Sequence, residues 1–318
     1  TQMFLGYSKL QCILYSIVCS ALLANVFVFF STPGCANVIN VLKKSLSDNM
    51  EKSRLYHLTQ RLETQVKAQK QVIAFLSQPI INSFDFNYTR SLKDACTKDA
   101  PELLVVVPSA PGNFRRRRKV RRSPRGLYAM NASNKAKLLF FVGKTPASPN
   151  VQRRLSLEAD DHGDIVMMDF DDEYRNILIK AVSMLRWTLT YCPNVTYVIR
   201  TDDDVEVDIA NLLKIMRNKS RNYENFILGD TNVYLDVVRD NRDKYYVSRE
   251  EYPHSTFPPF ALGGLLGYPV SSVALLYQAA LRLNPIWLDD VFITGMCAPK
   301  VDVPLLDDPE FIFEHPGM

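Results

Sequence analysis

Short apolar runs that alternate with helical patterns restrict the fold of this chain more than any other feature. The runs are rich in β-branched and aromatic residues, which is typical of buried strands. They cover residues 103–107, 138–142, 165–170, 195–201 and 226–229. Helical patterns occupy 174–191 and 270–283. Because alternating strands and helices favour parallel pairing, we expect an α/β fold with a mainly parallel sheet and helices on both faces.

Three consecutive aspartates stand where the strand at 195–201 ends. Asp202, Asp203 and Asp204 repel one another and are costly to remove from water. In open α/β sheets, ligands bind at the carboxyl ends of the strands. This position favours a hard divalent cation with oxygen ligands, and a solvated acidic turn is the alternative.

The spacing around the aspartates excludes two other kinds of metal site. An EF-hand loop that starts at Asp202 needs glycine and glutamate where the chain has Val207 and Leu213. The phosphatase-type pattern Asp-x-Asp-x-Thr/Val fails because Glu206 stands at its last position. The remaining interpretation is an Asp-x-Asp motif that binds a nucleotide-sugar diphosphate through a metal ion.

A long uncharged segment lies near the start of the chain. Residues 10–30 carry no charged side chain and are long enough to cross a bilayer as a helix. The apolar core of a cleavable signal peptide is shorter, about 7–15 residues, so a retained signal anchor is favoured. We therefore predict four parts: a cytosolic tail at 1–9, a transmembrane signal anchor at 10–30, a stem at 31–93 and a lumenal domain at 94–318.

Features after the anchor agree with a stem and a lumenal body. Residues 38–78 are polar, with apolar positions partly at helical spacing, which predicts a helical stem. A homodimeric coiled coil is the alternative, although its heptad is broken. Acceptors of the form N-x-S/T for N-glycosylation all follow the anchor, at Asn87, Asn131, Asn194 and Asn218. They favour a single-pass type II membrane protein.

A basic cluster follows the first strand. Residues 115–122 hold seven Lys or Arg side chains, whereas the whole chain has a net charge of +4, too small to indicate nucleic-acid binding by itself. The cluster fits four interpretations: a nucleic-acid patch, a protease processing site, a solvated face or a site for an anionic ligand. A lumenal location disfavours nucleic acid, and the place after a strand suits a helix that starts beside a diphosphate.

Two later segments carry further candidate site residues. Asp289 and Asp290 form a second acidic pair. Pro259 closes a proline pair, and Gly263 and Gly264 follow it. Paired prolines next to paired glycines suit a rigid loop where a backbone approaches a ligand, and structural packing is the alternative.

The cysteines point to a disulfide rather than to a metal site. The chain has six, without a CxxC pair that would suggest zinc. In a lumenal compartment, one disulfide is expected among Cys96, Cys192 and Cys297.

Taken in order, these segments resemble glycosyltransferase family 31, the β-1,3-galactosyltransferase-like and β-1,3-N-acetylglucosaminyltransferase-like enzymes. The similar stretches run in the family's order over about residues 94–298. They include PGNFR at 111–115, GDI at 163–165, LRW at 185–187, YCPN at 191–194, TDDDV at 201–205, PPF at 258–260 and DDVF at 289–292. The resemblance implies a Rossmann-like GT-A fold, a UDP-sugar donor, Mn²⁺, and a single-pass type II protein of the Golgi membrane.

The resemblance also implies roles for the acidic residues. Asp204 matches the direct metal ligand and Asp202 its partner on the ribose or uridine side. Asp290 matches the catalytic base, with Asp289 able to exchange roles with it. In-line attack by an acceptor hydroxyl needs one such carboxylate opposite the departing diphosphate. For Asp290, a helix N-cap is the alternative.

Other assignments complete the expected site. Donor binding is assigned to Arg116, Arg117, Arg121, Asp202 and Asp203. Acceptor binding is assigned to Tyr252, Pro259, Gly263 and Gly264. The resemblance further implies a disulfide between Cys96 and Cys192.

The chain departs from the family pattern at two places. Pro124 stands where the family commonly has tryptophan, on the uridine side of the site. After Cys297 the resemblance fades, and His315, the remaining candidate for a histidine near the metal, does not align.

Three hypotheses follow from the sequence. The first is an inverting β-1,3-hexosyltransferase that moves galactose or an N-acetylhexosamine from a UDP-sugar to a glycan of glycoproteins or glycolipids. The second is a catalytically silent relative that acts as a Golgi binding or chaperone-like protein. The third, a nucleic-acid binder through residues 115–122, is disfavoured by a lumenal location.

Overall fold

A computed structural model describes residues 49–84, 87–97, 100–231 and 235–313 of the chain. The chain divides into two units, residues 1–70 and 71–318, and each is described by itself. The helices and strands are α4 (Asn49–Leu76), β1 (Tyr88–Arg90), β2 (Leu103–Pro108), α5 (Phe114–Arg122), α6 (Pro124–Met130), η1 (Ala132–Asn134), β3 (Ala136–Lys144), α7 (Pro149–His162), β4 (Ile165–Asp171), η2 (Tyr174–Asn176), α8 (Ile177–Tyr191), β5 (Tyr197–Thr201), α9 (Ile209–Lys219), β6 (Ile227–Gly229), β7 (Leu265–Pro269), α10 (Val270–Ala280), η3 (Val291–Cys297), η4 (Ala298–Val301), β8 (Leu305–Asp307) and η5 (Pro309–Phe311).

Helix α4 accounts for the described part of the first unit. The prediction of a helix within 38–78 is confirmed for Asn49–Leu76. The predicted tail at 1–9 and the anchor at 10–30 lie outside the described residues, as does the start of the stem. Among the helices that the structure describes, none combines the length and the apolar character needed to cross a membrane. The anchor and the dimeric stem stay predictions.

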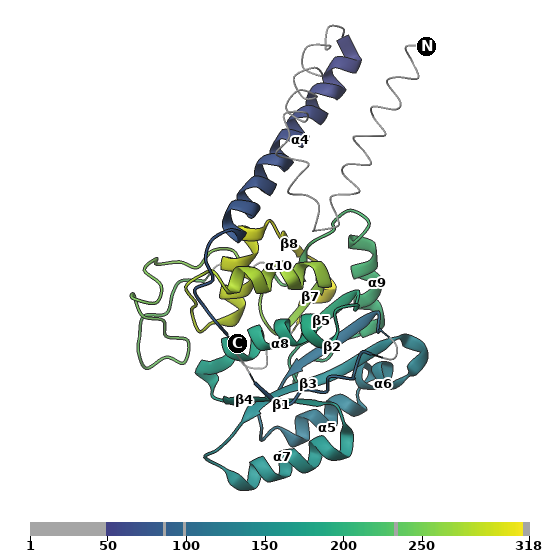
Figure 1. The fold of residues 1–318 in the computed structure, drawn as a ribbon, viewed down its shortest axis with the longest axis vertical. Helices are drawn as coiled ribbons and strands as arrows, with labels where there is room; N and C mark the ends of the chain where they lie inside the picture. Colours follow the sequence, from purple (N-terminus) through teal and green to yellow (C-terminus); the bar gives the residue numbers. More distant parts are fainter. Residues whose placement is uncertain (1–48, 85–86, 98–99, 232–234, 314–318) are drawn as a thin grey trace. The chain divides into compact units, whose positions relative to one another are not determined.

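The second unit is built on one mixed sheet (Figure 1). Within the described residues its strand order is β1-β4-β3-β2-β5-β7-β6-β8. The central strands β4, β3, β2 and β5 are parallel, as expected, but β1 and β7 pair with their neighbours in antiparallel fashion. Strand β7 was not predicted; its five residues lie directly between Gly264 and α10.

Helices cover both faces of the sheet, as predicted. On β2, Leu104 and Val106 belong to one core with α8 and α10, whereas Leu103 and Val105 belong to a second core with α7 and α9. This alternation follows from the two-residue period of a strand. A strand buried on both faces needs apolar residues throughout, and the burial of the whole run explains why β2 was easy to predict.

The sheet begins earlier in the chain than expected. Strand β1 lies ahead of residue 94, where we expected the lumenal domain to start, and Tyr88 lies opposite Met168 of β4. Its three residues carry no apolar alternation that would have marked a strand. Cys96 and Cys192 are joined in a disulfide, the pairing implied by the resemblance, with their Cα atoms 5.2 Å apart. This bond fixes the segment after β1 to the end of α8.

The chain reverses its direction of travel across the sheet between β2 and β5. After β2, the sequence adds β3 and β4 on one side, and then returns to place β5 on the other side of β2. The two strands are parallel, with Val106 opposite Arg200, so that their carboxyl ends reach the same edge. Such a switch point is where open α/β sheets bind ligands. The loops that begin at Ser109 and Asp202 meet there.

Candidate active site

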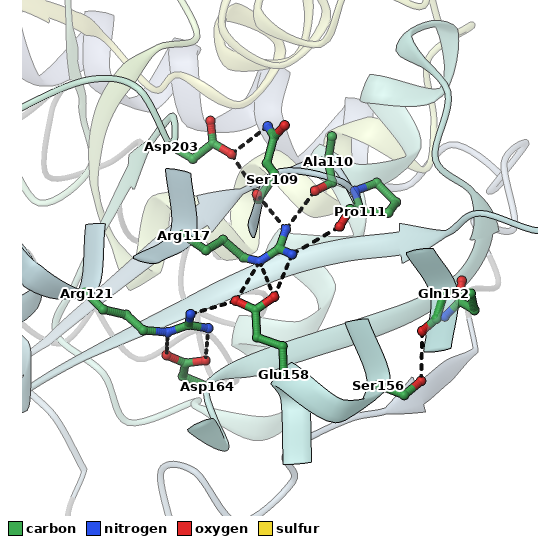
Figure 2. Close-up of polar contacts among 11 residues, drawn as sticks. Ser109, Ala110, Pro111, Arg117, Arg121, Gln152, Ser156, Glu158, Asp164 and Asp203 are labelled. Atoms are coloured by element: carbon green, nitrogen blue, oxygen red, sulfur yellow. Dashed lines mark hydrogen bonds and ion pairs between the residues drawn. The ribbon is translucent and has the colours of Figure 1, made fainter. Parts of the chain in front are cut away.

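The three aspartates after β5 have different surroundings. Asp203 is buried, with 5% of its side chain exposed. Its Oδ2 accepts a hydrogen bond from Ser109 Oγ at 2.6 Å (Figure 2). The same oxygen accepts a second hydrogen bond from Asn113 Nδ2 at 2.9 Å. By contrast, 39% of the Asp202 side chain and 32% of the Asp204 side chain are exposed. The middle carboxylate therefore holds the loops together, and the outer two remain accessible to a ligand.

Arg116 is the member of the basic cluster that reaches these aspartates. Its Nη1 lies 3.1 Å from Asp203 Oδ1 and 2.9 Å from Asp204 Oδ2. The hydrogen bond to Asp203 is the main reason why the pKa of Arg116 is raised. Half of the arginine side chain is exposed, so solvent screens this ion pair and weakens it. Arg116 is thus placed to meet an anion beside the exposed carboxylates.

Arg117 lies in the interior, although it was predicted to bind the donor. Its guanidinium donates to both oxygens of Glu158, to Ser109 Oγ and to the carbonyls of Ala110 and Pro111, at 2.7–3.1 Å. The side chain is fully buried. In Figure 2 it lies between Glu158 and the loop that follows β2. Because its donors point to protein acceptors, Arg117 shapes this loop rather than offering a free charge.

Arg121 is also engaged by carboxylates of the protein. It donates to Asp164 through Nε at 2.7 Å and Nη2 at 2.8 Å, and to Glu158 through Nη1 at 2.6 Å. Its guanidinium also lies over the ring of Phe140, 4.9 Å from the centroid. These contacts bind α5 to α7 and to the start of β4. The structure therefore brings Arg116 to the aspartates, but neither Arg117 nor Arg121.

Arg200 joins the two acidic segments of the chain. It is the next-to-last residue of β5 and is buried. Its Nη1 lies 2.5 Å from Asp289 Oδ2, and its Nη2 lies 3.9 Å from Asp202 Oδ1. A buried arginine must be compensated by negative charge, and here each acidic segment contributes. The predicted metal side and the predicted base side thus share one cluster.

The glycine pair closes around this cluster. Gly263 allows the close approach, because an added Cβ would lie 3.2–3.3 Å from the guanidinium nitrogens of Arg200 and from the Cβ of Asp290. The neighbouring carbonyl of Gly264 accepts the backbone N–H of Asp202 at 3.0 Å. Backbone groups therefore lie against both acidic segments, as the paired glycines indicated.

Asp290 stands at the start of the π-helix η3. Its Oδ1 accepts the N–H of Val291 at 2.8 Å, so the N-cap alternative is confirmed for this oxygen. Its Oδ2 faces the N–H of Gly263 at a long 3.4 Å. Burial and the charge of Asp289 raise the pKa of Asp290 to about 7, although Val291 and Arg200 act in the opposite direction. One oxygen is thus fixed by the helix, and the other is weakly bonded and basic enough to take a proton near neutral pH.

Asp202 also has a raised affinity for protons. Protein atoms around the partly exposed carboxylate reduce its hydration and raise its pKa to about 6, against the opposing effect of Arg200. The carboxylates of Asp289, Asp204 and Asp203 contribute to the increase. A cation nearby would lower the pKa of this carboxylate toward its ordinary value, because a positive charge stabilises the ionised form.

The other residues assigned to the acceptor make packing contacts. Tyr252 is buried and packs on Phe257, with their ring centroids 5.4 Å apart. Pro259 is exposed, and its carbonyl lies against Gly295 of η3, 3.3 Å from where a Cβ would stand. No contact of Tyr252 or Pro259 with the acidic segments is found in the described residues. The contacts of Tyr252 and Pro259 that the structure displays are packing contacts.

An open pocket adjoins the exposed Asp204. It is lined by Lys119, Val120, Ser123, Arg125, Asp203, Asp204, Val205 and Glu206. Arg125 is buried and donates through Nη1 to Thr201 Oγ1 at 2.9 Å and to the carbonyl of Asp202 at 3.0 Å. Burial lowers the pKa of Arg125 to about 10. Ser123 and Arg125, the chain neighbours of Pro124, line this pocket, which carries both signs of charge.

The predicted glycosylation acceptors lie on the surface. Asn87, Asn131, Asn194 and Asn218 are all exposed. Their exposure is compatible with modification, which stays a prediction.

Several residues of the site were not found from the sequence. Arg200 carried the clearest signal, since a charge within a buried strand needs a partner. Ser109 and Asn113 resemble ordinary loop residues, and their contact with Asp203 appears only once the switch point brings the two loops together. Glu158 lies on a helix of mixed polarity, where nothing distinguishes it from a solvated residue.

Comparison with known proteins gives a family. Residues 115–309 match the family model described as Galactosyltransferase. A UDP-GalNAc:beta-1,3-N-acetylgalactosaminyltransferase 1 from Rattus norvegicus is 31% identical over 72% of this chain and 70% of its own length. A lactosylceramide 1,3-N-acetyl-beta-D-glucosaminyltransferase from Homo sapiens is also 31% identical, over 70% of this chain and 65% of its own. A beta-1,3-galactosyltransferase 1 from Mus musculus is 28% identical over 70% and 68%.

Similarity to solved structures is much weaker. A mannosyltransferase from Pyrobaculum calidifontis in complex with GDP-Man and Mn2+ aligns with a TM-score of 0.39 and 15% identity, over 88% of this chain and 70% of that one. A score this low carries no argument about this site. The family model and the relatives lead to one conclusion: the chain is a glycosyltransferase and belongs to the galactosyltransferase family, glycosyltransferase family 31.

Proposed function

We propose that this chain is an inverting β-1,3-hexosyltransferase. It moves galactose, or an N-acetylhexosamine, from a UDP-sugar to a glycan acceptor of glycoproteins or glycolipids. The names of its relatives support this class of reaction. The observation that carries the proposal is the cluster around Arg200, in which Asp202 and Asp289 approach the same guanidinium. We further propose that the mixed sheet is a GT-A fold.

The proposed donor side consists of Asp202, Asp204 and Arg116. The exposed carboxylates suit a hard divalent cation such as Mn²⁺, because oxygen is the ligand that such ions prefer. Within the part of the chain that the structure describes, no three Asp, Glu, His or Cys side chains are grouped to hold a metal. Two carboxylates fit a cation that takes its other ligands from a diphosphate and water. When bound, Mn²⁺ supplies charge neutralisation for the departing diphosphate.

The proposed base is Asp290. Its Oδ1 is held by Val291, which fixes the carboxylate, and its Oδ2 has only a long contact to Gly263. A base works best when its pKa lies near the working pH, and a pKa of about 7 meets this condition. Asp290 would take the proton of the attacking hydroxyl while Arg200, through Asp289, holds this segment against the end of β5.

We propose a location and topology that go with this activity. The anchor at 10–30 would make the chain a single-pass type II protein of the Golgi membrane, with a lumenal catalytic domain. The exposed asparagines of the predicted N-glycosylation sites support a lumenal environment, and so does the disulfide between Cys96 and Cys192. Digestion of the expressed protein with an endoglycosidase tests this. We expect the digestion to shift the electrophoretic mobility of the protein, and we expect no shift in a variant that lacks Asn87, Asn131, Asn194 and Asn218.

A turnover assay tests the activity. The chain is incubated with UDP-galactose, UDP-N-acetylglucosamine or UDP-N-acetylgalactosamine, with Mn²⁺ and a panel of glycosides, and released UDP is measured. We expect transfer that EDTA abolishes and that falls at least about 100-fold in Asp204→Asn, since this carboxylate would hold the cation that neutralises the departing diphosphate. Asp161→Asn, an exposed change on α7, serves as the matched control and should leave turnover intact.

One observation favours the catalytically silent alternative. Arg116 already neutralises Asp204, and a cation would have to displace it. Measured UDP binding with no turnover for any donor would support the silent relative and contradict the proposed activity. Turnover that depends on Asp204 would exclude it.

A further inference from the structure

Two exposed tyrosines lie together at the base side of the site. Tyr174 begins η2, just after β4, and its residue is 51% exposed. Tyr245 belongs to the segment between β6 and β7 and is 40% exposed. The two phenol groups are close enough for Tyr245 to affect the pKa of Tyr174. Single exposed aromatic residues are common on proteins, but two neighbouring ones beside buried carboxylates are typical of a binding surface.

A rigid support lies behind these rings. The ring of Tyr174 packs on Trp287, with centroids 5.5 Å apart. Trp287 is nearly buried and donates its Nε1–H to the carbonyl of Tyr246 at 2.9 Å. Arg175 covers the indole at 4.3 Å and donates to the same carbonyl at 2.8 Å. Since Tyr246 adjoins Tyr245, these contacts fix both tyrosines relative to one another.

The tyrosines lie near the proposed base rather than near the Asp202–Asp204 edge. Trp287, on which Tyr174 packs, precedes Asp289 and Asp290 in the same short segment. Burial and Tyr245 raise the pKa of Tyr174, and the charges of Asp289 and Asp290 add to the increase. A ligand that packs on these rings would therefore place its hydroxyl groups near Asp290.

We propose that Tyr174 and Tyr245 form the platform that binds a pyranose ring of the acceptor glycan. A pyranose has a flat apolar face of C–H groups and a rim of hydroxyls. A tyrosine offers the matching chemistry, an apolar ring with a polar tip, and it loses little entropy when it is already held in place. The assignment rests on the proposed hexosyltransferase activity and adds two residues that recognise the acceptor, in addition to Gly263 and Gly264.

Steady-state kinetics test the platform. UDP-galactose is the donor, and p-nitrophenyl β-glycosides of galactose, N-acetylglucosamine and N-acetylgalactosamine are the acceptors. We expect Tyr174→Ala to raise the acceptor KM about tenfold, in line with the loss of one aromatic contact, and to change the donor KM less than twofold. Tyr174→Phe, which keeps the ring, should recover most of this loss. Tyr223→Ala, at a tyrosine before β6 that is 42% exposed, should have no effect.

A binding measurement separates this inference from the activity on which it rests. Saturation-transfer NMR of the same glycosides, with enzyme and UDP but without donor, needs no turnover. Signals that weaken in both Tyr174→Ala and Tyr245→Ala would support the platform even if no transfer is found. Tyr245→Ala also covers the case in which Tyr174→Ala fails to fold. Transfer with an unchanged acceptor KM in both variants, or a change confined to the donor KM, would overturn it.

Discussion

The Asp202–Asp204 edge and the Arg117–Glu158 network are both rich in charge, yet the structure uses them in opposite ways. At the edge, Asp204 is partly exposed and faces an arginine that is half in solvent. In the network, Arg117 is fully buried and Glu158 nearly so, and the acceptors around the guanidinium belong to the protein. Partly exposed charges at the sheet edge can still bind a ligand. The buried charges already bond to protein groups, and they hold the loop after β2 in place.

The comparison explains the basic cluster. In the sequence, residues 115–122 form one run of positive charge. In the structure, helix α5 turns Arg117 and Arg121 inward and Arg116 toward the aspartates. Helical periodicity separates neighbours in this way, since side chains one residue apart point in different directions. A charge run can therefore contain both a binding residue and structural residues.

The largest expected effect on stability comes from breaking the network. Glu158→Gln leaves Arg117 buried without its carboxylate, and the loss of one partner of a buried pair costs about 3–5 kcal/mol. Chemical denaturation followed by circular dichroism measures this change. The exposed Glu250→Gln is the control and should stay within about 0.5 kcal/mol of the original chain. Equal stability of both variants would show that the network does not hold the loop.

A smaller effect, of a different kind, is expected at the edge. Arg116→Ala removes a screened ion pair and should cost at most about 1 kcal/mol of stability. It should raise the KM for the UDP-sugar about tenfold, because an arginine next to a diphosphate contributes charge and hydrogen bonds. Arg118→Ala, an exposed neighbour on the same helix, should change neither quantity. A stability loss in Arg116→Ala as large as that of Glu158→Gln would abolish the distinction between the two regions.

A pH dependence of stability is a further expected effect. The pKa of Asp290 is raised from 3.8 to about 7, so the folded chain keeps a proton that the unfolded chain releases. Stability from this group is therefore present at low pH and is lost as the pH rises from about 4 through 7. Denaturation at several pH values should show a weaker decline in Asp290→Asn than in Asp161→Asn. An identical decline in both variants would indicate that Asp290 has an ordinary pKa.

Much of the fold was within reach of the sequence. The central strands and α8 carry strong apolar patterns, because each is buried over most of its length. Strands β1, β7 and β8 were missed. Strands β1 and β8 have only three residues each, and β7 stands between a glycine pair and a helix.

The site was predictable in its acidic residues but not in their supports. Carboxylates grouped at a strand end are unusual enough to be noticed. Arg200, which links the two segments, is recognised only when β5 is known to lie beside the loop that carries Asp290. The inward turn of Asp203 likewise depends on Ser109, which comes from a different strand end.

The most direct test of the central claim is the turnover of Asp290→Asn measured together with its affinity for UDP and Mn²⁺. If the aspartate edge binds the donor and Asp290 takes the acceptor proton, UDP affinity should stay within about twofold while transfer falls at least about 100-fold. Transfer that persists at the original rate in Asp290→Asn, with the protein folded and UDP bound, would contradict the account.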